Sequence, residues 1–306
     1  MRKLKGSPIP TGQSEWSCRS RPVGRPTAWP ASSRIASGVL GQTIVVENRG
    51  GGAGGSVGAK VVATADPDGY TILITPGGAL TTGPAVHSNI GYDPVKAFVP
   101  VACLIESPLV IASHQDLPVK SLADVVAYAK ANPGKIIWGS QGFGTAPHLL
   151  LEMFKLETGM NVVHVPYRGT APMLAAIVAG EVQMIADVMT TSLPHIESGK
   201  LRPLAIAGPE RSPKLPDVPT TPEIGYRDLQ APFWLGVVAP GGTPPAIIDK
   251  LNAALRESLA PPQTRALLAK LGAEIRIGTP AEFGKLLSDE LSKWTAVVKA
   301  ANIRVD

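Results

Sequence analysis

The sequence predicts an α/β protein, in which strands and helices alternate and build mostly parallel sheets covered on both faces. Short β-branched runs alternate with segments of helical length from about residue 35 to the end of the chain. Hydrophobic residues make up 44% of the sequence and charged residues 17%, so the chain can bury a sizeable core. The length of 306 residues is enough for two ordinary domains.

The first third of the chain is predicted from β-branched runs and turn residues. Strands are expected at 43–47, 71–75 and 99–105, because these stretches are rich in Val, Ile and Thr. A glycine-rich stretch follows the first strand, and a short helix is expected at 59–65. The turn residues at 66–69, Asp-Pro-Asp-Gly, end this helix.

The rest of the chain is predicted from helix caps. Ser121 with Asp124, and Thr279 with Glu282, form capping boxes that begin helices. Thr145 and Thr170 precede helices with Pro in the first turn. Between and after these caps we expect strands at 136–138, 162–165, 183–185 and 233–239, and helices at 244–258, 261–271 and 279–301.

Composition excludes several classes of function. The net charge is +5, but residues 1–34 contribute +6, so the remaining 272 residues sum to −1 and offer no basic stripe for a nucleic acid. No two of the five histidines lie three to five residues apart, so no metal site is predicted. Cys18 and Cys103 form no CxxC motif; two free thiols are the simpler interpretation, and a disulfide stays open.

Two successive strand-to-helix connections share one design and predict an anion site. Each of the segments 138–145 and 165–172 leaves a strand, passes small residues and begins a helix, whose N-terminus offers unpaired N–H groups. A third strand ends near Asp187, whose carboxylate can accept a hydrogen bond from a ligand or an ordered water. Routine helix capping is the alternative for all of these positions. The candidate residues in these connections are Ser140, Gly142, Gly144, Thr145, Gly169 and Thr170.

Enzyme motifs fit poorly. A hydrolase elbow around Ser140 would need Gly at the position of Trp138. The glycines at 50, 52 and 55 satisfy G-x-G-x-x-G, but the next predicted strand ends at Thr75 without the acid that would bind a ribose. No G-K-[ST] occurs, so a P-loop is excluded. We therefore expect no catalytic residue and no cofactor.

The chain resembles a known family through many collinear motifs. They include ENRGGGAGGSVGA (47–59), DPDGYTIL (66–73), ANPGKIIWGSQGFGTAPHLL (131–150), VVHVPYRGTAPML (162–174) and FWLGVVAPGGTP (233–244). These motifs look like the Bug family, the TctC-type periplasmic receptors of tripartite tricarboxylate transporters. The likeness extends from about residue 35 to the C-terminus, and it is more specific for the family than for the ligand.

The resemblance implies a two-lobe, Venus-flytrap fold with the ligand cleft between the lobes. Lobe 1 would comprise residues 35–106 and 229–306, and lobe 2 residues 107–228. The family's ligand loops match 140–145, 167–170 and Asp187 of lobe 2. To these, the resemblance adds Tyr167 in lobe 2, Thr75 and Gly78 in lobe 1, and Phe233 near a crossover, for which a core aromatic is the alternative.

The resemblance also implies the protein's partners. Family members capture a di- or tricarboxylate, an acidic amino acid or an aromatic acid in the periplasm and deliver it to membrane subunits. We expect a monomer without a nucleic-acid partner. A sensory receptor that signals ligand state to a membrane partner is the alternative, and an enzyme of unknown type is a more distant one.

Residues 1–34 depart from the family pattern. Family members begin with an apolar strand, a Pro-Gly-Gly loop and an Asp that supplies part of the ligand site, whereas this chain reads PVGRPTAW at 22–29 with no strand before it. No apolar segment of a signal peptide follows the initial MRKLKG. We expect this segment to be poorly ordered and hypothesise a frame error or a misassigned start. Sequencing of the coding region tests this, and an intact frame without an upstream start would refute it.

Overall fold

The computed structural model describes residues 15–16, 40, 42, 44–47, 49 and 53–303. The expectation for residues 1–34 therefore falls outside the described residues except for Glu15–Trp16, which form strand β1 and pair in parallel with β2 (Val45–Val46). Cys18 also lies outside them, and Cys103 is a free, buried thiol. No helix in the described part of the chain is long and apolar enough to cross a bilayer.

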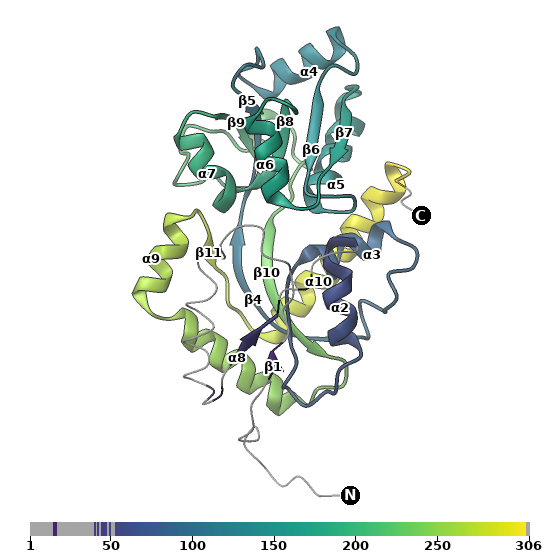
Figure 1. Ribbon diagram of the computed structural model, residues 1–306, viewed down its shortest axis with the longest axis vertical. Helices are drawn as coiled ribbons and strands as arrows, with labels where there is room; N and C mark the ends of the chain where they lie inside the picture. Colours follow the sequence, from purple (N-terminus) through teal and green to yellow (C-terminus); the bar gives the residue numbers. More distant parts are fainter. Residues whose placement is uncertain are drawn as a thin grey trace, which may run out of the picture.

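Two larger sheets organise the described residues, one above the other in Figure 1. The lower sheet has the order β11-β4-β10-β3, with β3 at Leu73–Pro76, β4 at Phe98–Ser107, β10 at Phe233–Pro240 and β11 at Glu274–Ile275. The upper sheet has the order β7-β6-β8-β5-β9, with β5 at Leu109–His114, β6 at Ile137–Ser140, β7 at Val163–Pro166, β8 at Met184–Val188 and β9 at Leu201–Ile206.

Helices cover both sheets, so that each sheet has its own core. The lower sheet is accompanied by α2 (Ser56–Ala63), α3 (Thr82–Val86), α8 (Pro245–Leu259), α9 (Pro262–Lys270) and α10 (Pro280–Ala300). The upper sheet is accompanied by α4 (Leu122–Ala131), α5 (Ala146–Thr158), α6 (Thr170–Val178) and α7 (Met189–Glu197). Short 3-10 turns are η1 (Ala53–Gly55), η2 (Gly77–Ala79) and η3 (Pro222–Ile224).

The prediction that both sheets are mostly parallel is wrong in detail. In the lower sheet, β10 pairs antiparallel with both β3 and β4, and β11 pairs antiparallel with β4. In the upper sheet, β6 pairs in parallel with β7 and β8, whereas β5 pairs antiparallel with β8 and β9. The pairing of β10 with β4 is antiparallel because the chain passes from one sheet into the other along β4 and β5 and returns along β10.

The C-terminal helix connects the two halves of the molecule. Trp294 on α10 is fully buried in the same apolar cluster as Leu109, Trp138 and Phe154 of the upper half. Phe283, about three turns earlier on the same helix, is buried in the lower half and forms a T-shaped ring pair with Trp234, 5.4 Å between centroids. Residues 229–306 therefore contribute to both cores.

The capping residues in the sequence predicted where several helices begin. The Ser121 side chain accepts the Asp124 N–H at the start of α4, and Thr279 with Glu282 forms the predicted capping box of α10. Thr145 occupies the predicted N-cap position of α5, although its side chain makes no cap hydrogen bond among the described residues. For α6 the prediction was wrong by one residue, because Gly169 occupies the N-cap position at φ 105° and Thr170 is already helical.

Candidate functional site

The two predicted strand-to-helix connections lie side by side. They join β6 to α5 and β7 to α6, and β6 and β7 are neighbouring parallel strands. Beyond the ends of these strands, the Tyr167 N–H donates to the Ser140 carbonyl at 2.8 Å and the Gly169 N–H to the Gln141 carbonyl at 3.2 Å. The sheet thus brings both helix N-termini to one edge, as expected for the carboxyl ends of parallel strands.

The 140–145 loop is stabilised by hydrogen bonds within itself. Thr145 Oγ1 donates to the Gly142 carbonyl at 2.8 Å, and among the described residues it accepts no N–H from the first turn of α5. Gly142 and Gly144 have φ values of 137° and 70°, which L side chains adopt only with strain. The glycines therefore permit a loop path that leaves the first N–H groups of α5 without a side-chain cap.

The 167–170 loop leaves the start of α6 similarly open. No side chain of the described residues caps this helix, and its first turn holds no acidic residue. In the described part of the chain, no atom lies within 4 Å of a Cβ built on Gly169. Tyr167 is half-buried and packs against the apolar cluster around Met173. Both helices therefore offer N–H groups and the positive end of a helix dipole.

Asp187 lies in β8 and is completely buried, with its carboxylate bonded within the protein. Gln141 Nε2 donates to Oδ1, while Thr191 Oγ1 and Ser192 Oγ donate to Oδ2 at 2.7 and 2.8 Å. Burial raises the pKa of this carboxyl to about 6, and the hydrogen bonds oppose the shift. Asp187 thus ties the 140–145 loop to the start of α7.

The predicted residues of the lower half lie on β3 and the η2 turn that follows it. Thr75 is buried, and its hydroxyl donates to the Pro76 carbonyl at 3.0 Å. Gly78 approaches the backbone of Gly54 so closely that an added Cβ would lie 2.6 Å from the Gly54 carbonyl oxygen. Two glycines therefore let η1 and η2 pack backbone against backbone.

Helix α3 brings the lower half into contact with the 140–145 loop. A Cβ built on Gly144 would lie 3.4 Å from the Val86 Cβ. Thr82 lies four residues before Val86, hence on the same face of α3. Its side chain is buried, and its hydroxyl makes no hydrogen bond among the described residues. The sequence analysis did not single out Thr82, because burial of its hydroxyl depends on tertiary packing.

Phe233 begins β10, opposite Ser107 at the point where the chain crosses between the halves. Its side chain is partly buried and packs against the core of the upper half. The structure therefore places Phe233 at the junction.

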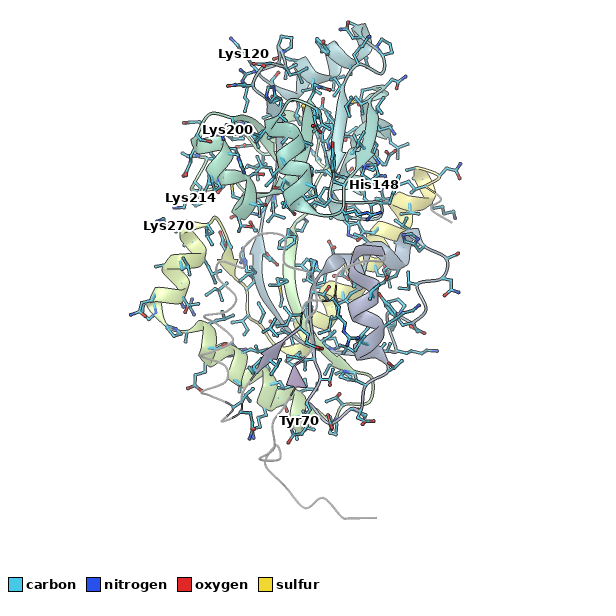
Figure 2. The ribbon with its side chains drawn as sticks, viewed as in Figure 1. Tyr70, Lys120, His148, Lys200, Lys214 and Lys270 are labelled. Carbon is cyan, nitrogen blue, oxygen red and sulfur yellow. The ribbon has the colours of Figure 1, made fainter. Side chains whose placement is uncertain are left out.

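A histidine pair that sequence reasoning considered only as metal ligands lies beneath the loop. His148 and His164 stack with ring centroids 4.3 Å apart and an interplanar angle of 15°. Figure 2 shows His148 on the side of the upper half that faces the lower half. His164 Nε2 lies 2.7 Å from Ser140 Oγ. Among the described residues, no three His, Cys, Asp or Glu side chains are grouped to hold a metal ion.

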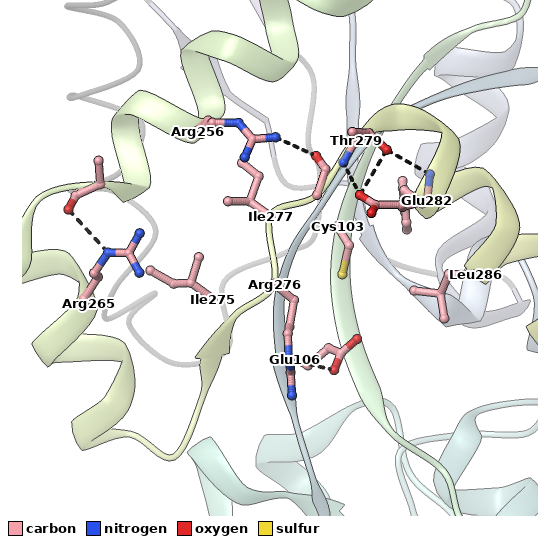
Figure 3. Close-up of a pocket in the computed structure, with 13 residues that line it drawn as sticks. Cys103, Glu106, Arg256, Arg265, Ile275, Arg276, Ile277, Thr279, Glu282 and Leu286 are labelled. Carbon is pink, nitrogen blue, oxygen red and sulfur yellow. Dashed lines mark hydrogen bonds and ion pairs between the residues drawn. The ribbon is translucent and has the colours of Figure 1, made fainter.

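A separate cavity of about 760 Å³ lies beside β11 in the lower half (Figure 3). Arg256, Arg265 and Arg276 line it, and none of the predicted site residues does. The guanidinium groups are bonded within the protein: Arg276 pairs with Glu106 at 3.4 Å, and Arg256 donates to the Gly278 carbonyl at 3.2 Å. This cavity is therefore distinct from the two-loop site.

Known proteins resemble this chain over nearly its whole length. Residues 32–303 match the profile of TctC, the tripartite tricarboxylate transporter family receptor. The chain is 36% identical over 274 residues to protein BugT of Bordetella pertussis, which covers 89% of this chain and 84% of that protein.

Solved structures resemble the fold as a whole. The structure of R. palustris Rpa4515 with adipate has a TM-score of 0.88 and 33% identity, and covers 96% of this chain and 99% of that chain. MatC from Rhodopseudomonas palustris with bound malate has a TM-score of 0.86 and 32% identity, and covers 94% and 99%.

Proposed function

Because the chain belongs to the TctC family of tripartite tricarboxylate transporter receptors, we propose that it binds a dicarboxylate through the N-termini of α5 and α6. The two-lobe α/β fold and the predicted resemblance to Bug proteins are confirmed, and the protein is a solute-binding receptor for small organic carboxylates. The observation that carries the site assignment is the pairing of two uncapped helix N-termini at one sheet edge.

The chemistry of this site suits a carboxylate. Helix α5 has 13 residues and helix α6 has 9. The first N–H groups of a helix have no carbonyl partner within it, so donors without a helical partner remain at the 140–145 and 167–170 loops. Each N-terminus carries roughly half a positive charge, so two of them can balance an anion without Arg or Lys. Gly142, Gly144 and Gly169 allow the ligand to approach the backbone, and Ser140, Thr145, Tyr167 and Thr170 shape the same loops.

The remaining predicted residues take supporting roles. We assign Asp187 to positioning, since its carboxylate accepts hydrogen bonds from Gln141, Thr191 and Ser192 within the protein. Thr75 and Gly78 form the opposing wall of the lower half, where Thr82 offers an unused hydroxyl to the ligand. Phe233 closes the side of the site at the junction of the halves.

The choice of a dicarboxylate follows the two neighbours with adipate and malate. The lobes at 35–106 with 229–306 and at 107–228 would close on the ligand by hinge motion where β4 and β10 connect them. We further propose a periplasmic location, a monomeric state and delivery of unchanged ligand to membrane subunits of a transporter.

A thermal-shift screen tests the proposal. Adipate, malate, a tricarboxylate, glutamate and benzoate are added to the purified chain, and the unfolding midpoint is measured. A ligand at a hundred times its Kd stabilises the native state by about 2.7 kcal/mol. We expect a dicarboxylate to raise the midpoint and Thr145→Val to weaken the effect.

The control is Glu282→Gln, which alters a helix cap on α10 outside the two loops. A cooperative melt that no carboxylate shifts would contradict the proposed function. NMR of the ligand after incubation separates a receptor from an enzyme, because a receptor returns the ligand unchanged.

A further inference from the structure

Helix α5 begins with an unusual acceptor. In an ordinary capping box, the third helical residue is Glu or Gln and accepts a backbone N–H at the helix start. Helix α10 follows this pattern, since Glu282 Oε2 accepts the Thr279 N–H at 2.7 Å. In α5 the third residue is His148, and its Nδ1 accepts the N–H of Gly144, one residue before the N-cap Thr145, at 3.2 Å. An imidazole thus replaces the carboxylate.

The second imidazole holds the other end of the same loop. His164 stacks on His148, and its Nε2 lies 2.7 Å from Ser140 Oγ. Phe143, between the two ends, packs its ring edge against both imidazoles, at 5.4 and 5.2 Å between centroids. The 140–145 loop is therefore fixed at Ser140 and Gly144 by one stacked pair.

The geometry requires His148 to be uncharged. Because its Nδ1 accepts a hydrogen bond, the ring proton must reside on Nε2. Burial lowers the pKa of both rings to about 4. The nearest charged groups are Glu152, whose Oε1 lies 3.9 Å from His148 Nε2, and Lys155, which pairs with Glu152 at 2.9 Å. These two charges balance each other.

A neutral acceptor is what an anion-binding helix start requires. A carboxylate at the third position would place a negative charge within one turn of the N–H groups that the ligand uses. Like charges at such a separation repel, and in a partly buried site the effect reaches tenfold or more in affinity. An imidazole fixes the loop without this repulsion.

We propose that His148 and His164 are positioning residues of the ligand site: as a stacked, uncharged pair they cap the 140–145 loop while leaving the positive helix end free for an anion. This proposal rests on the proposed function and adds the residues that make its helix N-terminus selective for a carboxylate.

Two replacements of His148 separate capping from charge. His148→Gln supplies a neutral acceptor and His148→Glu a charged one, and both are standard at this helix position. The Kd for adipate and for malate is measured by calorimetry at pH 8, where an introduced carboxylate is ionised. We expect His148→Gln to bind at least tenfold more tightly than His148→Glu.

Glu282→Gln makes the corresponding change in α10, and we expect it to leave the Kd unchanged. Circular dichroism melts verify that each variant is folded. Equal affinity of the two folded His148 variants would overturn the proposal while leaving the proposed function intact. A wild-type protein that binds neither acid would overturn both.

A measurement on the wild-type protein covers the case in which a variant does not fold. Nitrogen-15 NMR of the imidazoles distinguishes the two neutral tautomers and the cation. We expect the Nε2–H tautomer for His148, and no protonation of either ring between pH 8 and pH 5.5. A cationic ring, or an Nδ1–H tautomer for His148, would refute the proposal regardless of any ligand.

Discussion

Asp187→Asn removes a buried negative charge but keeps the size of the side chain. The carboxylate accepts hydrogen bonds from Gln141, Thr191 and Ser192. An Asn carbonyl can still accept one of them, and its NH₂ group can donate to a hydroxyl oxygen that has rotated. Thr191 Oγ1 also has the Val188 carbonyl as an acceptor at 2.9 Å. The connections of the network can therefore survive the change, whereas the charge does not.

The size of the effect follows from the pKa of Asp187. Burial raises it from 3.8 to about 6, and a pKa difference of about 2 corresponds to about 3 kcal/mol. Between these two pH values, the folded protein holds a proton that the unfolded chain has lost. The stability associated with this proton is fully present below pH 3.8 and is lost as the pH rises through 6. Above that pH, the loss is constant.

Urea unfolding of the wild type and Asp187→Asn between pH 4 and pH 7.5 measures this effect. We expect the free energy of unfolding of the variant, minus that of the wild type, to rise by up to about 3 kcal/mol across this range. Other titrating groups, including His148 and His164, occur in both proteins and cancel in the difference. If the difference in free energy of unfolding between variant and wild type does not change with pH, the pKa of Asp187 is not raised. The conclusion that the buried carboxylate destabilises the folded protein would then be refuted as well.

Three further changes test the packing and the site. Gly78→Ala places a Cβ 2.6 Å from the Gly54 carbonyl oxygen, so we expect a loss of about 1–3 kcal/mol in urea unfolding and weaker ligand binding; full stability would contradict the close approach. Thr279→Ala removes a cap of α10, and we expect a loss of about 1 kcal/mol with an unchanged Kd for adipate; a weakened Kd would show that α10 reaches the site. Thr82→Val removes a buried hydroxyl that makes no hydrogen bond among the described residues, so we expect the ligand-free protein to gain about 1 kcal/mol while affinity falls; affinity equal to wild type would exclude this hydroxyl from the ligand.

Much of the local structure followed from the sequence. The capping residues Ser121 and Thr279 were recognisable because a cap joins residues three positions apart. The run from β6 through α5, β7 and α6 to β8 was also predictable, because helices of this length between short strands favour parallel crossovers. The two loops proposed for ligand binding lie inside this run, and two of the motifs of the family resemblance, at 131–150 and 162–174, overlap it.

The structure decided what depends on distant partners. Sequence patterns could not show that β10 returns antiparallel beside β4, because strand direction depends on the path between the sheets. They could not show that His148 stacks on His164, although the position of His148 three residues after Thr145 was a usable signal for a cap acceptor. Nor could they show that the Asp187 carboxylate is buried and bonded within the chain.

One physical cause separates the features that were predictable from the sequence from those that only the structure showed. Caps, turns and helix starts are set by hydrogen bonds between near neighbours, so the residue types in a short window determined them. Strand direction, ring stacking and the pKa of a buried carboxyl depend on which surfaces pack together in the core. Burial of apolar surface is not directional, so a short sequence window does not show which surfaces will meet. The sequence by itself therefore determined the family and the candidate loops. Only the tertiary structure placed an uncharged histidine pair beneath one of them.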